Sequence, residues 1–172
     1  MNLSQVYKLP AGPLKLKMLS KPITDPKLLP KGAPSVNISA NLTDFYLLVT
    51  SNPKNKVVPV RLRVINANAG RVKRGQMLWY NLTKKTITGK IGKQKLHLKP
   101  SNHRVIKEPI KGKKNYPVEL QFTIPGDNFV HPLCETQWRH DPRSRSIVFV
   151  VPDNNRRAPR VLAFSDFRIP AK

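Results

Sequence analysis

Three residues in the C-terminal third of the chain are of the types that bind transition metals. His131, Cys134 and His140 form an H-x2-C-x5-H set, and Asp141 follows directly. Imidazole and thiolate are ligands for zinc or copper, and three protein ligands leave one coordination position open. The spacing matches no established metal motif, however, and Cys134 lies in an apolar run in which free cysteine acts as a small hydrophobic side chain. We therefore predict no metal and no cofactor, and leave open whether these three side chains meet.

The same segment contains the side-chain types of a serine hydrolase. His140 and Asp141 are close in sequence to Ser144 and Ser146. A nucleophilic serine also needs a base held by a third group and an oxyanion hole, usually with glycine beside the nucleophile. No glycine lies near these serines, and an aspartate before proline between arginines is typical of a solvent-exposed turn. We predict that the protein is not an enzyme.

Cationic side chains are the more abundant candidates. The 172 residues include 32 Lys+Arg and 9 Asp+Glu, a net charge of +23. Residues 61–115 hold 16 of the basic residues and one acidic residue, Glu108. Such a field attracts nucleic acid, acidic polysaccharide or an anionic membrane surface, although a solvated surface that keeps the protein soluble is the alternative. The residues that we predict to bind an anionic partner are Arg61, Arg63, Arg71, Lys73, Arg74, Lys84, Lys85, Lys90, Lys93 and Lys95.

Two aromatic residues lie within this basic region. Trp79 and Tyr80 are of the type on which single-stranded nucleic acid stacks beside lysines and arginines. Adjacent residues of a strand face opposite sides, so at most one of the two is expected to be exposed. Exposed aromatic residues along the basic surface would distinguish a nucleic-acid-binding protein from other binders of anions.

The elements that carry these cations are predicted to be strands. Within residues 57–65, aliphatic residues at 58, 60, 62 and 64 alternate with Pro59, Arg61 and Arg63, which is typical of a strand with one dry and one basic face. Similar runs follow at 76–83, 86–91 and 94–98, separated by short turns. We expect residues 56–98 to form an antiparallel meander whose basic face meets solvent.

The rest of the chain indicates the same fold class. Seventeen prolines, eight glycines and the absence of a helical apolar period disfavour helices. About eleven short strands predict an all-β, antiparallel β-sandwich, immunoglobulin-like or a related Greek key, with little or no helix. We expect one domain over residues 1–172, in which residues 1–56 complete the sheets because they hold too few apolar residues for a core of their own. The single cysteine excludes an internal disulfide, and no apolar run is long enough for a transmembrane segment.

Several short stretches resemble a pattern in uncharacterised exported bacterial β-sandwich proteins. They are GQMLWYNLT at 75–83, GKIG at 89–92, LKP at 98–100, CETQWRHDPR at 134–143 and FSDFR at 164–168. The resemblance covers roughly residues 57–168 and carries no activity. It implies a periplasmic or cell-envelope location, whereas the first five residues begin no export signal and leave the cytoplasm as the alternative.

These observations lead to one leading hypothesis and two competitors. We expect a non-catalytic binding or scaffolding module of the bacterial envelope that engages an anionic partner through a basic sheet face, with an affinity that falls steeply with salt. The alternative is a cytoplasmic nucleic-acid-binding protein. A metal-dependent enzyme around His131, Cys134 and His140 is less favoured.

Overall fold

The computed structural model describes residues 3–68, 71–127, 129–153 and 155–168, which are almost entirely strands and their connections. The chain divides into two compact units, and each is described by itself. Residues 5–71 contain β1 (Leu14–Lys17), the 3-10 helix η1 (Pro26–Leu28), β2 (Ser35–Ile38), β3 (Phe45–Ser51) and β4 (Val60–Asn66). We call this part the N-terminal unit.

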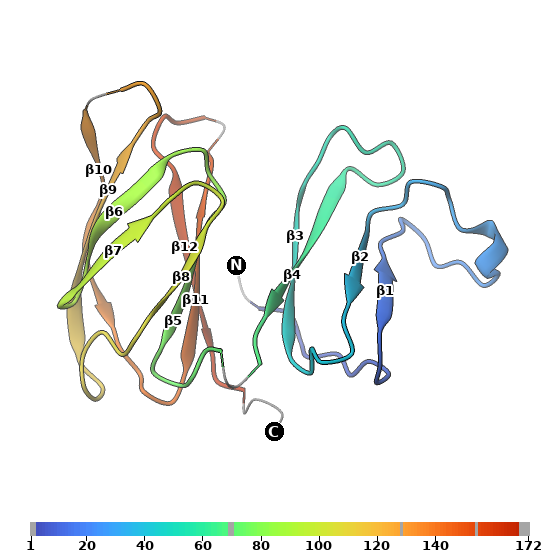
Figure 1. The fold of residues 1–172 in the computed structure, drawn as a ribbon, viewed down its shortest axis with the longest axis horizontal. Helices are drawn as coiled ribbons and strands as arrows, with labels where there is room; N and C mark the ends of the chain where they lie inside the picture. Colours follow the sequence, from blue (N-terminus) through green and yellow to red (C-terminus); the bar gives the residue numbers. More distant parts are fainter. Residues whose placement is uncertain (1–2, 69–70, 128, 154, 169–172) are drawn as a thin grey trace. The chain divides into compact units, whose positions relative to one another are not determined.

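The second part, which we call the sandwich unit, holds the remaining strands within residues 72–169. These are β5 (Met77–Asn81), β6 (Thr86–Ile91), β7 (Gln94–Leu98), β8 (His103–Ile106), β9 (Asn115–Thr123), β10 (Val130–Arg139), β11 (Arg145–Val151) and β12 (Arg160–Asp166). One sheet has the order β10-β9-β6-β7 and the other β12-β11-β5-β8 (Figure 1). The chain crosses between the sheets four times, after β5, β7, β8 and β10. The predicted all-β sandwich is confirmed.

The core of the sandwich unit lies between its two sheets. Apolar residues alternate inward along β9, where Val118, Leu120 and Phe122 are buried. They pack in one cluster with Ile87 of β6 and Trp79 of β5. The Trp79 indole also stacks on Trp138 of β10, with ring centroids 5.7 Å apart and planes only 5° from parallel. This arrangement joins the two sheets through a large apolar contact.

Strands β5 and β11 differ from their neighbours because they are buried on both faces. Leu78 and Ile147, which alternate with core residues, are 0% and 1% exposed. The two strands are also the one parallel pair among the described strands, with Met77 opposite Ser146 and Asn81 opposite Val150. Continuous apolar runs are typical of strands that are covered on both sides.

The prediction of a meander over residues 56–98 was wrong. β4 pairs with β3 in the N-terminal unit, β5 pairs with β11 and β8, and β6 and β7 belong to the opposite sheet. Alternation identifies a strand and its two faces, but it does not specify which strand lies beside it. β4 also begins later than expected, because the Asn55 side chain accepts hydrogen bonds from the backbone N–H groups of Val57 and Val58 and holds them in a turn.

The N-terminal unit consists of two hairpin-like pairs, β1 with β2 and β3 with β4. Leu14 lies opposite Ile38 and Leu16 opposite Val36, so the apolar residues of the first pair share one face. Its strands pair among themselves in the described chain. The expectation of a single domain over residues 1–172 stays a prediction.

Both ends of the sandwich unit are defined by strand direction. β5, β7, β9 and β11 begin at one end, where β6, β8, β10 and β12 finish, as the antiparallel registers require. We call the end at which β5, β7, β9 and β11 begin the basic end, and the opposite end the tip end. At the tip end the buried Asn81 amide donates to the carbonyls of Lys85, Leu98 and Lys99 and accepts from Thr83. One side chain therefore ties the β5–β6 connection to the β7–β8 connection.

Candidate functional site

The three candidate metal ligands do not meet. His131 lies near the start of β10 opposite Phe122, Cys134 lies opposite Leu120, and His140 follows the end of the strand. Nine residues of extended chain separate the two histidines by about 30 Å. The described residues contain no group of three or more His, Cys, Asp and Glu side chains that could hold a metal ion. The H-x2-C-x5-H spacing thus places its members along one strand rather than around one point.

His140 is buried and is held by its neighbours. Its backbone N–H donates to the Lys114 carbonyl at 2.8 Å, and its ring packs edge-on against Tyr116. The buried Nε2 has no hydrogen-bond partner among the described residues, although the Glu108 carboxylate lies 3.5 Å away. Burial raises the pKa of Tyr116 to about 12, so its hydroxyl stays protonated.

No serine triad forms in this segment. The Asp141 carboxylate accepts two hydrogen bonds from the Arg143 guanidinium, at 3.0 and 2.7 Å, rather than one from His140. These bonds hold the pKa of Asp141 far below its usual range. The Ser144 hydroxyl donates to the Asp141 carbonyl oxygen. The geometry is that of a turn stabilised by an aspartate and an arginine.

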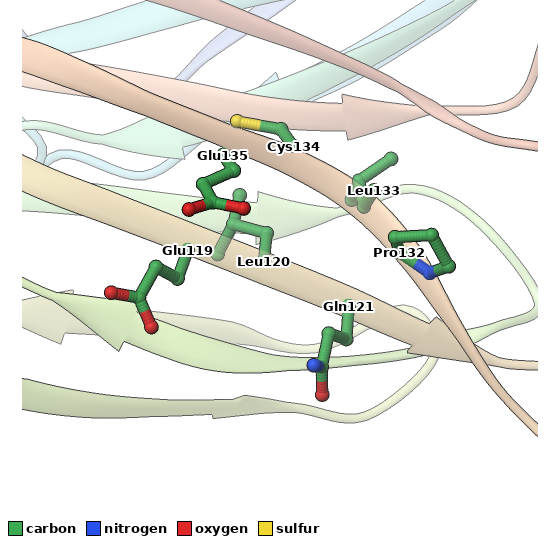
Figure 2. A pocket seen from close by; sticks show the side chains of 7 residues that line it. All are labelled: Glu119, Leu120, Gln121, Pro132, Leu133, Cys134 and Glu135. Carbon is green, nitrogen blue, oxygen red and sulfur yellow. The ribbon is translucent and has the colours of Figure 1, made fainter.

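A hollow lies on the sheet surface where β10 bulges. The register shifts between Pro132 and Cys134, and Figure 2 shows the hollow beside Glu119 and Glu135, which are opposite one another on β9 and β10. It has a volume of about 530 Å³ and is open to solvent. Burial raises the pKa of the Cys134 thiol, which disfavours the reactive thiolate. This hollow therefore presents no activated nucleophile.

The ten cations predicted to form a binding face lie in several places. In the N-terminal unit, Arg61 and Arg63 are on β4 and Arg71 follows them. In the sandwich unit, Lys73 and Arg74 precede β5, and Lys84 and Lys85 connect β5 to β6. Lys90 on β6 is opposite Lys95 on β7, and Lys93 is in the turn between these two strands. Glu119 also lies opposite Lys90, so the outer face of this sheet carries both signs of charge. The structure brings Lys73, Arg74 and Lys93 to the basic end, and Lys84 and Lys85 to the tip end.

Further cations lie at the basic end together with Lys73, Arg74 and Lys93. The segments involved are 73–75 before β5, the β6–β7 turn at 92–93, the β8–β9 connection at 107–114 and the β10–β11 connection at 139–143. In these segments the structure describes nine exposed basic residues: Lys73, Arg74, Lys93, Lys107, Lys111, Lys113, Lys114, Arg139 and Arg143. Figure 1 shows the β8–β9 and β10–β11 connections at the same end of the sandwich.

Hydrogen bonds fix these segments to one another. The Gln94 amide donates to the carbonyls of Lys107 and Glu108, at 3.0 and 3.1 Å. The bond from the His140 N–H to Lys114 joins the β8–β9 and β10–β11 connections, and a bond from the Gly75 N–H to the Ser144 carbonyl joins the segment before β5. The lysines and arginines are therefore held on a common support, while their long side chains extend into solvent.

Few carboxylates offset these cations. Of the described acidic residues, only Glu108 and Asp141 lie in the four segments. Asp141 is taken up by Arg143 and lies 3.8 Å from the Lys113 ammonium. Glu108 lies beside His140. Nine basic and two acidic residues leave a local excess of positive charge that is not neutralised within the unit.

A scan of protein-family models and a search of curated proteins both found no match to this chain. The site must therefore be assigned from its own geometry. Among the described residues, no helix is both long and apolar enough to cross a membrane.

Only three of the nine cations at the basic end, Lys73, Arg74 and Lys93, are among the residues that were predicted to bind. The prediction placed the binding surface on a sheet face, and the lysines of 107–114 were not among its residues. The pattern that could have found the cluster is the position of basic residues at strand ends. In a sandwich of alternating strands, the connections that follow even-numbered strands meet at one end, whatever the pairing order.

Proposed function

We propose that the protein is a non-catalytic binding or scaffolding module of the bacterial cell envelope that holds an anionic macromolecule at the basic end. The observation that carries the proposal is a set of nine exposed cations on four segments that hydrogen bonds connect. The same four segments contain only two carboxylates. The envelope location rests on the resemblance to exported bacterial proteins. The anionic partner would contact the loops at one end of the two sheets, rather than a sheet face as the sequence predicted.

Binding at such a surface is electrostatic. Lysines supply six of the nine cations, and a lysine ammonium is a mobile point charge rather than a planar fork for a defined anion geometry. The surface should therefore tolerate different arrangements of sulfate, phosphate or carboxylate groups along a polymer. Affinity should come mainly from the release of counterions and should decrease steeply with added salt.

The alternative, a nucleic-acid-binding protein of the cytoplasm, loses its expected stacking platform. The Trp79 ring is 0% exposed and lies against Trp138 inside the core. Tyr80 is half-buried and stacks on His103 and Phe149. Trp79 cannot receive an unstacked base without unfolding of the surrounding strands, and the Tyr80 ring already contacts two aromatic neighbours, which favours an anion recognised by charge alone.

The test compares two variants that remove equal charge. Lys93, Lys107 and Lys111 are changed together to Gln at the basic end, and Lys15, Lys17 and Lys21 are changed together to Gln in the N-terminal unit as the matched control; all six are exposed. Heparin binding is measured by titration at several salt concentrations. We expect the first variant to lower the slope of log K against log salt by about 2–3, since each lost ionic contact removes about 0.7–0.9. The control should retain the wild-type slope.

Two results would contradict the proposal. One is wild-type heparin binding that does not weaken with salt, and the other is an equal loss in both triple variants. A single-stranded oligonucleotide that remains bound at salt concentrations that release heparin would favour the nucleic-acid alternative instead.

A further inference from the structure

The tip end of the sandwich unit exposes two adjacent apolar side chains. Phe129 is 73% exposed, the highest value among the large hydrophobic residues that the structure describes, and Val130 beside it is 56% exposed. They lie where the β9–β10 connection enters β10 (Figure 1). We call Phe129 and Val130 the apolar tip. A phenylalanine ring held in water is unfavourable, and contact with an apolar partner would remove this cost.

Hydrogen bonds hold Asp127 and Phe129 in place. The Phe129 N–H donates to the Asp127 carboxylate at 2.9 Å, and the Asp127 N–H donates to the Ile124 carbonyl at 3.0 Å. The other carboxylate oxygen lies 2.7 Å from the Arg157 guanidinium and 3.0 Å from His131 Nε2. The His131 ring in turn stacks on Phe122 of the core. Phe129 is thus presented outward by a fixed support.

Cations lie at the same end of the sandwich unit as the apolar tip. The Lys85 ammonium donates to the Arg157 carbonyl, which links the β5–β6 turn to the β11–β12 connection, and it also lies over the Phe122 ring, 4.9 Å from its centroid. Lys84 and Arg156, the neighbours of these two residues, are exposed. The Asp127 carboxylate is occupied by its three partners beneath the loop.

We propose that the apolar tip inserts into the interface of an anionic lipid membrane. Phe129 and Val130 enter the boundary between headgroups and acyl chains, while Lys84, Lys85, Arg156 and Arg157 remain at the level of the headgroup phosphates. One inserted apolar group gives only marginal, reversible membrane binding, and nearby cations supply the second signal that makes it stable. This site lies at the opposite end of the strands from the basic end and adds a second function to the proposed one.

The size of the apolar tip favours a lipid surface over a folded protein. A standard protein–protein interface buries about 800 Å² on each partner. Two adjacent side chains supply only a small part of such an area. An exposed aromatic side chain with lysines and arginines at the same end of the unit matches the arrangement in which apolar atoms enter a bilayer and charged groups stay in water.

Tryptophan placed at the tip reports insertion directly. Phe129→Trp and the control Phe167→Trp are each mixed, as full-length chains, with vesicles of phosphatidylcholine and phosphatidylglycerol or of phosphatidylcholine alone. Phe167 is also an exposed phenylalanine, 56% exposed, but it follows the end of β12 at the basic end. We expect a blue shift of emission for Phe129→Trp with the anionic vesicles and no shift for Phe167→Trp.

Sedimentation with the same vesicles measures the strength of binding. Phe129→Ser should lower the partition coefficient by roughly 10- to 100-fold, as expected for an apolar side chain that no longer leaves water. Phe167→Ser should leave it unchanged. Changing Lys84 and Arg156 together to Gln should reduce binding about fivefold for each charge on anionic vesicles only.

Three outcomes would overturn the proposal: vesicle binding without a shift at position 129, a shift at position 167 instead, or equal binding of Phe129→Ser and wild type. Concentration-dependent self-association without lipid, abolished by Phe129→Ser, would assign the tip to a second copy of the chain. Heparin binding by Phe129→Ser should match wild type, so this inference and the proposed function fail separately.

Discussion

Gly89 shows how closely the backbones of the sandwich approach one another. It lies in the middle of β6 with φ +152°, opposite Leu120 on β9 and Leu96 on β7. A Cβ atom built on it would lie 2.0 Å from the Glu119 carbonyl oxygen, which belongs to the backbone and cannot turn aside. Only glycine permits both this φ and this contact.

We expect Gly89→Ala to destabilise the protein by about 3 kcal/mol or more, because it combines a strained backbone with a steric clash. Gly126→Ala is the control. Gly126 has φ +80°, but a Cβ there meets nothing within 4 Å, so only the backbone strain of about 1 kcal/mol applies. Chemical denaturation of the two variants measures the difference, and equal losses would show that the contact with Glu119 relaxes freely.

At the scale of elements, the sequence predicts strands better than it predicts their neighbours. Alternation is clearest in β9, where every second residue is buried, whereas the run at 76–83 was expected to have one basic face in solvent and β5 is instead buried on both faces. Neither pattern states that β5 pairs with β11 or that β6 belongs to the other sheet, because pairing over such distances depends on how the whole set of strands packs. The basic end was missed for a different reason. The binding residues were sought on a sheet face, whereas the cations of the basic end lie in the connections at the ends of the strands.

The β9–β10 connection offers a test of one element by pH. The hydrogen bond with His131, and then that from the Phe129 N–H, lower the pKa of Asp127 from its ordinary value of 3.8. Because the folded-state pKa is below the unfolded one, the ionised carboxylate stabilises the protein above pH 3.8, and this contribution is lost as the pH falls through the lowered pKa. Asp127→Asn should therefore unfold more easily than wild type at neutral pH.

The difference in unfolding free energy between wild type and Asp127→Asn should decrease as the pH is lowered below 3.8. Glu135→Gln, an exposed change on the same hairpin, provides the comparison. A difference that stays constant down to strongly acidic pH would mean that Asp127 acts through its shape rather than its charge.

At the scale of the whole molecule, the net charge of +23 opposes compactness. Like charges on the folded surface repel one another, and unfolding moves them apart. The Debye length decreases from about 30 Å at 0.01 M salt to about 10 Å at 0.1 M, so added salt screens this repulsion. The protein should gain thermal stability over a range of salt in which its binding to polyanions weakens.

We expect the melting temperature to rise with sodium chloride, by about 2–4 °C for each kcal/mol of repulsion that is relieved. The triple variant with Gln at 93, 107 and 111 should melt above wild type at low salt, and this gap should close as salt increases. Circular dichroism melts measure both effects. A triple variant that melts at or below wild type in low salt would show that these lysines stabilise the fold rather than strain it.

The parallel pair of β5 and β11 has a consequence for the order in which the polypeptide is made. Met77 and Ser146 are direct neighbours in the sheet but are separated by about 70 positions along the chain. At a translation rate of about 5–20 residues per second, β11 leaves the ribosome roughly 4–14 s after β5. Throughout that interval β5, one of the most apolar strands, has no neighbour on that side, so the sheet cannot be completed before residues 145–151 have been synthesised.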